Sequence, residues 1–267
     1  MTMEEMKEWK RRKGYTYAQI SELSGVPLGT VQKIFSGETE NPRYETILAL
    51  QSFFMLDRAG EQEKYPEDDR VCESSALYAA KRPGEYTIDD YRALPEERRV
   101  ELIDGCFYDM AAPSAVHQMI SGEIHRQIAN YIYDRGGACT PIISPVDVQL
   151  DRDDKTMVQP DVIIVCNRDQ IVYRNVIGAP DFVVEVVSPS SRRKDYLLKM
   201  NKYENAGVRE YWLVDMKAKV VLVFFFESES CPAIYPLGDQ IPVNIYDGEL
   251  VIRFERMAAW VEEMSGE

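Results

Sequence analysis

The chain has 267 residues, which is enough for one or two domains with a sizeable core. Hydrophobic residues make up 45% and charged residues 28%, as in a soluble globular protein, and no apolar run approaches the ~20 residues that a membrane-spanning helix needs. The net charge of −14 falls entirely beyond residue 60, because residues 1–60 hold eight acidic and eight basic side chains. An acidic body repels phosphate at long range, so nucleic acid would have to be held by a local basic patch or a metal ion.

The cysteines are odd in number and form no C-x-x-C pair; they are Cys72, Cys106, Cys139, Cys166 and Cys231. This pattern predicts reduced thiols in a cytosol and argues against a structural zinc site. Residues 1–15 lack the apolar segment of a secretory signal, so we expect a cytoplasmic location.

Residues 16–37, TYAQISELSGVPLGTVQKIFSG, predict two short helices joined by a turn. Thr16 is a suitable N-cap for the first helix, Gly25 ends it, and Pro27 suits the first turn of the second. Gly37 then ends the second helix, as glycine commonly does. Two helices joined by a glycine-containing turn are typical of a helix-turn-helix unit.

Residues 4–56 resemble the Cro/repressor-type (XRE) DNA-binding domain, and we set the domain at residues 1–57. The resemblance implies that the start of the second helix enters the major groove. The expected DNA contacts comprise a base-facing set and a phosphate-facing set: Leu28, Gly29, Gln32 and Lys33, and Arg11, Arg12 and Lys13. The alternative is a small helical domain that serves protein contacts or dimerisation.

A charged segment with prolines and glycines, residues 58–84, predicts a linker before a second domain at residues 85–267. Thr87 and Asp90 have the spacing of a capping box at the start of a helix. The next elements are predicted to be a hairpin that turns at Asp104-Gly105 and a long amphipathic helix over residues 114–136.

From Pro141 onward the pattern changes to strands. They are expected at residues 142–150, 157–166, 179–188, 210–215 and 219–227, with one helix between the third and the fourth. Continuous apolar strands and a crossover helix predict an α/β fold, a mixed sheet flanked by helices on both faces.

Glu185 lies inside the apolar run FVVEVV, where an unpaired carboxylate would cost several kcal/mol. Asp161 opens the preceding strand, so the two carboxylates converge if these strands pair. With a main-chain carbonyl they would make an oxygen-rich site suited to Mg²⁺ or Mn²⁺. Lys199 lies in an apolar helical stripe with Tyr196 and Tyr203, and an inward lysine requires such a partner.

Residues 86–256 resemble the Uma-type restriction endonuclease family, which has the PD-(D/E)xK nuclease fold. The segments that carry the match are YTIDDYRALP, VELIDG, the P-S-x-x-H ending at His117, QPDVIIV, PDFVVEVVSPSSRRKD and the residues from Lys199 to Asp215. Val187 stands where the strict motif has its lysine, and the resemblance implies that Lys199 replaces it.

The resemblance implies metal-assisted phosphodiester hydrolysis. The cation would be held by Asp161, Glu185 and the carbonyl of Val186, while Lys199 orients water or stabilises the transition state. Glu101 is a candidate acidic ligand, and His117 a candidate substrate contact. If these roles hold, Glu185→Gln or Lys199→Ala should abolish cutting and leave the melting temperature near wild type.

Three functions are compatible with these observations. The first is a Mg²⁺-dependent DNA endonuclease whose N-terminal domain binds DNA. The second is a DNA-binding regulator whose nuclease-like body is catalytically silent and forms a homodimer. The third is a nuclease acting on RNA or another phosphodiester.

Overall fold

The structure is a computed structural model that describes residues 3–13, 15–24, 26–39, 42, 46, 50, 54, 81–95, 97–151, 154–188, 191–192, 194–228 and 232–264. The chain forms two compact units, one built mainly from residues 1–64 and the other mainly from 65–228 and 235–267. Most of the predicted linker lies outside the described residues, so the domain boundaries stay predictions.

The first unit contains α1 (Met3–Lys13), α2 (Tyr17–Ser24) and α3 (Leu28–Ser36). The hydroxyl of Thr16 accepts the Gln19 N–H at 3.2 Å at the start of α2, and Gly37 ends α3 with φ +84°. Their own core comprises Met6, Trp9, Ile20, Val26, Val31, Ile34, Phe35, Leu50 and Phe54. Helices therefore occur at both predicted positions, whereas a DNA-binding helix-turn-helix remains a prediction.

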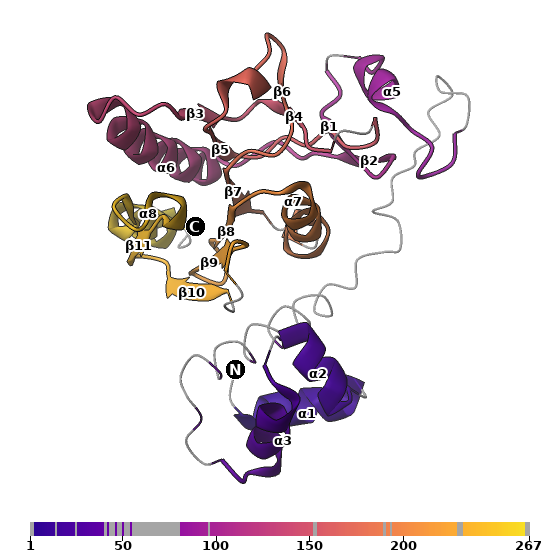
Figure 1. The fold of residues 1–267 in the computed structure, drawn as a ribbon, viewed down its shortest axis with the longest axis vertical. Coiled ribbons are helices and arrows are strands. Elements are labelled where there is room, and N and C mark those ends of the chain that lie inside the picture. Colours follow the sequence, from indigo (N-terminus) through magenta and orange to yellow (C-terminus); the bar gives the residue numbers. More distant parts are fainter. Residues whose placement is uncertain are drawn as a thin grey trace. The chain divides into compact units, whose positions relative to one another are not determined.

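The second unit is built on a six-stranded sheet with the order β10-β9-β8-β7-β5-β3 (Figure 1). Its strands are β3 (Thr140–Ile143), β5 (Val162–Val165), β7 (Phe182–Val187), β8 (Glu210–Asp215), β9 (Val220–Phe225) and β10 (Ala233–Pro236). β7 and β8 run parallel, and β5 is antiparallel to both β3 and β7. The parallel pair is joined by a π-helix (Lys194–Lys199) that continues into α7 (Met200–Ala206).

Helices cover both faces of this sheet, as the sequence predicts (Figure 1). On one face lie α6 (Ala115–Asp134) and α8 (Glu255–Met264), whose apolar side chains share one core with Phe182, Val184 and Val186 of β7. On the other face, α7 presents Tyr203 to Glu185, where the two side chains form a hydrogen bond. Because side chains alternate along β7, Glu185 points away from the α6 core and toward α7.

The start of the second unit confirms two local predictions. Thr87 and Asp90 form a capping box on α5 (Ile88–Arg92). β1 (Val100–Ile103) and β2 (Cys106–Asp109) form an antiparallel hairpin that turns at Asp104-Gly105. Both turn residues have positive φ, +50° and +70°, as a two-residue hairpin turn requires.

The strand predicted over residues 142–150 is wrong as a single element. β3 ends before Ser144-Pro145, because proline cannot donate to a sheet ladder. Beyond it, β4 (Asp147–Gln149) pairs in parallel with β6 (Asn175–Ile177) in a separate two-stranded sheet. A further pair, β11 (Gln240–Pro242) and β12 (Val251–Arg253), is antiparallel. Short 3-10 helices at Arg168–Gln170 and Asn244–Tyr246 complete the described elements.

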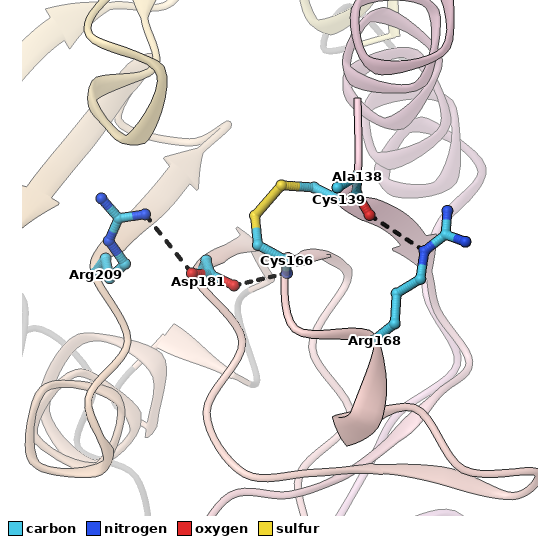
Figure 2. Close-up of a disulfide and its surroundings, with 6 residues drawn as sticks. All are labelled: Ala138, Cys139, Cys166, Arg168, Asp181 and Arg209. Carbon is cyan, nitrogen blue, oxygen red and sulfur yellow. Dashed lines mark hydrogen bonds and ion pairs between the residues drawn. A yellow bond between two sulfur atoms is a disulfide. The ribbon is translucent and has the colours of Figure 1, made fainter. Parts of the chain in front are cut away.

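The prediction that all cysteines are reduced is also wrong, because Cys139 and Cys166 form a disulfide (Figure 2). Thr140 pairs with Val165 across β3 and β5, so the two cysteines lie directly opposite each other just beyond this pair. The Cys166 N–H also donates to Asp181 at 2.8 Å, which connects the disulfide to the start of β7. Within the described part of the chain, no helix is long and apolar enough to cross a membrane.

Candidate active site

Asp161 and Glu185 are neighbours at one end of the β5–β7 pair. Val162 pairs with Val184 in antiparallel register, and continuing this register by one residue places Asp161 opposite Glu185. Asp161 accepts the Val186 N–H through Oδ2 at 2.8 Å. The adjacent pairing predicted from the sequence is therefore present, and β7 itself fixes the position of the Asp161 carboxylate.

Glu185 is 4% exposed, and its partners come from the helical segment that follows β7. Lys199 Nζ lies 2.8 Å from Glu185 Oε1, and the Tyr203 hydroxyl donates to the same oxygen at 2.7 Å. Lys199 and Tyr203 are one helical turn apart, so both reach one oxygen from the same helix face. Val187, at the position where the strict motif has its lysine, is buried on the same face of β7 as Glu185. Because valine carries no charge, the ammonium group that contacts Glu185 comes from the helix instead of the strand.

Glu101 on β1 is fully buried and contacts the same lysine. Its Oε1 atom lies 2.7 Å from Lys199 Nζ and accepts the Gln159 N–H at 3.0 Å. Its Oε2 atom lies 2.6 Å from Lys194 Nζ. In this geometry Glu101 is an anchor for two lysines, which differs from the direct metal ligand that the sequence allows.

Asp195 is a further buried carboxyl that the sequence reasoning missed. It is 1% exposed and its Oδ1 atom lies 3.7 Å from Lys199 Nζ, one turn along the π-helix. The Asp195 main-chain carbonyl accepts the Tyr211 hydroxyl at 3.1 Å, which ties this turn to β8. An acid four residues before an inward lysine was the available signal, since i and i+4 share a helix face.

His117 lies in the first turn of α6, where its N–H donates to the Ser114 side chain at 3.2 Å. Its Nε2 atom lies 3.2 Å from Asp161 Oδ2, and the Val186 carbonyl lies against the same ring. Burial opposes protonation of the imidazole, but the hydrogen bond and charge of Asp161 outweigh it and raise the pKa of His117. His117 was expected to touch substrate, and the structure places it against Asp161.

The cluster contains more buried carboxyls than buried cations. Among the described residues, Glu101, Glu185 and Asp195 lie around Lys199, and Lys194 is a second cation that contacts Glu101. Burial raises the pKa of Glu185 well above its ordinary value and that of Asp195 to about 6, against the opposing effect of Lys199. Burial has the same effect on Glu101, but Lys199 and Lys194 reverse it and lower the pKa of that carboxyl to about 2. One more positive charge would therefore be stabilised by the excess of carboxyl groups.

The donor atoms fit a hard divalent cation. The β5–β7 register places the Asp161 and Glu185 carboxylates and the Val186 carbonyl near one end of β7. Mg²⁺ commonly binds one or two carboxylates and completes its shell with water or phosphate. Within the described residues, no three His, Cys, Asp or Glu side chains are gathered closely enough to hold a metal ion by themselves. Any cation at this position would therefore need oxygen atoms from water or substrate.

The sequence-predicted catalytic residues come together in the second unit, and their roles remain predictions. The residues that were missed are Gln159, Lys194 and Asp195. Gln159 donates through its side chain to Tyr91 at 3.1 Å and Asp147 at 2.8 Å, so it links Glu101 to β4. Its position two residues before Asp161 gave no chemical signal, because its contact with Glu101 uses the main chain.

The predicted DNA contacts of the first unit lie on exposed positions. In α3 these are Leu28, Gly29, Gln32 and Lys33, while Val31, Ile34 and Phe35 face the core. In α1, Arg11 and Arg12 are exposed, and the side chain of Lys13 lies outside the described residues. The face that would meet DNA is thus open, although DNA binding itself stays a prediction.

Comparisons with known proteins agree with the fold of the second unit. Residues 88–252 match the family model Uma2, described as "Putative restriction endonuclease". An uncharacterized protein of Synechocystis sp. (slr1290) is 29% identical over 141 residues, which cover 52% of this chain and 71% of that protein. A crystal structure described as a putative nuclease of DUF820, from Anabaena variabilis, aligns with a TM-score of 0.54 and 21% identity, over 66% of this chain and 98% of its own.

The central mixed sheet, flanked by helices and carrying two acids beside an inward lysine, defines a restriction-endonuclease-like α/β protein. The match covers more than half of the chain, and the protein belongs to the Uma2 family.

Proposed function

We propose that this protein is a metal-dependent DNA endonuclease whose helical N-terminal unit binds DNA. The observation that carries the proposal is the arrangement of the partly exposed Asp161 and the buried Glu185 beside the Lys199 ammonium group, which lies 2.8 Å from Glu185. A scaffold has no need to bury such groups, since apolar side chains of similar volume are often as stable or more so. The Uma2 family membership supports the same reaction.

Mg²⁺ or Mn²⁺ bound by Asp161, Glu185 and the Val186 carbonyl would polarise the scissile phosphate and lower the pKa of a bound water. The chain supplies the remaining steps. Lys199 donates hydrogen bonds to the attacking water or to the phosphate oxygens as negative charge builds up. Tyr203 holds the Glu185 carboxylate in one orientation through its 2.7 Å hydrogen bond.

Glu101 serves as a positioning residue in this mechanism. It holds Lys199 at 2.7 Å while Glu185 contacts the same ammonium group, so the ammonium group stays in place when a phosphate approaches. Lys194, held by the other Glu101 oxygen, brings a second positive charge to the same side. A buried carboxylate between two lysines lets these cations lie close together despite their mutual repulsion.

The N-terminal unit would deliver the acidic second unit to DNA. The exposed face of α3 offers Gln32 and Lys33, and exposed Arg11 and Arg12 lie on α1. Leu28 and Gly29 offer no hydrogen bonds to base edges, so their role is apolar contact and close approach. Phosphate contacts by the basic side chains would supply most of the affinity.

The test is cleavage of supercoiled plasmid by the full-length protein with Mg²⁺, Mn²⁺ or EDTA. We expect metal-dependent cutting that is lost in Glu185→Gln, which keeps the shape and removes the charge. Glu204→Gln, the same change at an exposed position of α7, is the matched control and should cut normally.

Three results would contradict the proposal in different ways. Cutting that persists in Glu185→Gln points to another site or to a contaminant. Absence of cutting together with salt-dependent DNA binding points to a catalytically silent regulator. Cutting of RNA in preference to DNA assigns the site to a different substrate.

A further inference from the structure

His117 occupies a position that the two-acid and lysine arrangement does not require. It lies on α6, across the sheet edge from the helix that carries Lys199, and its Nε2 atom is 3.2 Å from Asp161 Oδ2. The Val186 carbonyl lies against the same ring. His117 is therefore next to two of the three donors assigned above to the cation, and it is 7% exposed.

We propose that His117 is itself a ligand of the cation, so that the site has one nitrogen donor and selects Mn²⁺ over Mg²⁺. This inference rests on the proposed metal-dependent function. The direct ligands would be the His117 imidazole, the Asp161 carboxylate and the Val186 carbonyl. Glu185, which is engaged by Lys199 and Tyr203, would reach the cation directly or through a water molecule.

The geometry between the ring and the carboxylate suits two adjacent ligands of one ion. Metal–nitrogen and metal–oxygen bonds of roughly 2.1 Å at a right angle put the two donor atoms about 3.0 Å apart. Nε2 and Oδ2 are separated by 3.2 Å, and both are carried by well-packed elements, the start of α6 and the end of the β5–β7 pair.

Metal ions bind the neutral imidazole, whereas the contact with Asp161 favours the protonated form. The position is in the first turn of a 20-residue helix, where the helix dipole disfavours a cation. Burial disfavours the imidazolium as well. When a cation binds, the proton shared by His117 and Asp161 would leave to solvent, and the charge of the metal replaces it.

A nitrogen ligand changes which metal the site prefers. Imidazole favours divalent transition metals, of which Mn²⁺ is bound most weakly, over Mg²⁺, which prefers oxygen donors in near-ideal octahedral geometry. A site made only of carboxylates and carbonyls would hold the two ions with a smaller difference in affinity. The identity of residue 117 would thus set the metal specificity of the proposed nuclease.

Pulsed electron paramagnetic resonance of bound Mn²⁺ tests this directly, because a coordinated imidazole nitrogen modulates the echo. The chain has two histidines, so untagged protein leaves His117 and His125 as the imidazole sources. We expect the nitrogen modulation in wild type and in His125→Asn, the control on the same helix, and its loss in His117→Asn. The wild-type spectrum alone can refute the proposal, even if a variant fails to fold.

Calorimetric titration gives the second readout. We expect His117→Asn to lower Mn²⁺ affinity by roughly tenfold or more, with a much smaller change for Mg²⁺. Bound Mn²⁺ without imidazole modulation in wild type would overturn the proposal and leave His117 as a hydrogen-bond partner of Asp161. Mn²⁺-dependent cleavage in that same protein would keep the nuclease proposal intact, whereas absence of any Mn²⁺ binding would overturn both.

Discussion

Replacing Lys199 with methionine should destabilise the protein strongly. Lys199 is 2% exposed, and its ammonium group contacts Glu101 at 2.7 Å and Glu185 at 2.8 Å. Methionine has a similar length and fills most of the space, so the main effect is the removal of one positive charge. Two buried carboxyls then lose their shared partner, although Glu101 keeps Lys194.

Breaking a buried ion pair by removing one partner typically costs about 3–5 kcal/mol. For a chain of this size each kcal/mol lowers the melting temperature by about 2–4 °C, so we expect a decrease of roughly 6–20 °C at pH 7. The sequence alone predicts that loss of this lysine leaves the melting temperature near wild type. That expectation treats Lys199 as a catalytic group only. The burial of Lys199 between two acids contradicts the expectation, because it gives the lysine a structural role as well.

The stability lost in Lys199→Met should become smaller as the pH falls. Burial raises the pKa of Glu185 above its unfolded value, and removal of Lys199 would raise it further. A carboxyl with a higher pKa in the folded state binds more protons when folded, so stability rises as the pH falls through the folded pKa. The gap between wild type and Lys199→Met should therefore be wider at pH 8 than at pH 5.

Urea unfolding tests the predicted destabilisation with four proteins: wild type, Lys199→Met, Glu185→Gln and the double variant. We expect Glu185→Gln to recover part of the stability lost with Lys199, because it removes one uncompensated charge. Lys202→Met, a half-buried lysine on α7 paired with Asp104 and Asp151, is the control and should cost about 1 kcal/mol or less. A Lys199→Met melting temperature within a degree or so of wild type, or no recovery in the double variant, would refute the reasoning.

Four further predictions concern separate features. Burial raises the pKa of Asp195 to about 6, so wild type should lose stability relative to Asp195→Asn as the pH rises from about 4 to 7, by up to roughly 3 kcal/mol in urea unfolding. Cys139→Ser opens a disulfide whose cysteines are 27 residues apart and should lower the unfolding free energy by about 3.5 kcal/mol relative to oxidised wild type, whereas reduced wild type should match the variant. Gly105→Ala places a side chain on a residue with φ +70° and against the main-chain carbonyl of Gly84. We expect thermal melting to show a loss of unfolding free energy of at least about 1–3 kcal/mol. Lys33→Gln should weaken duplex binding at every sequence and reduce the slope of log affinity against log salt by about 1.

Local patterns in the sequence predicted the elements that local physics determines. The capping box at Thr87 and the hairpin turn at Asp104-Gly105 depend on neighbouring residues, and both are present. The alternation of side chains along β7 likewise places Glu185 on the face opposite Phe182, Val184 and Val186. These features require no knowledge of which strands are adjacent in space.

The features that the sequence did not predict depend on long-range register. Cys139 and Cys166 face each other because β3 and β5 pair antiparallel, and the cysteine count gave no indication of that pairing. Lys194 reaches Glu101 across a gap of more than ninety residues. The π-helical turn before α7 also shifts the helix face, so Met200 is only half-buried while Asp195 is buried.

The relocated lysine makes the β1–β2 hairpin a part of the candidate site. In the strict motif the lysine stands two residues after the glutamate on one strand, so the strand itself fixes the distance between the two groups. Here that position is Val187, and the ammonium group reaches Glu185 from a separate helix on a long flexible side chain. A second anchor is then needed to hold it, and Glu101 supplies this anchor from β1, outside the main sheet. The position of Lys199 therefore depends on the hairpin as well as on β7, so substitutions in the hairpin that displace Glu101 should affect the chemistry without touching a metal ligand.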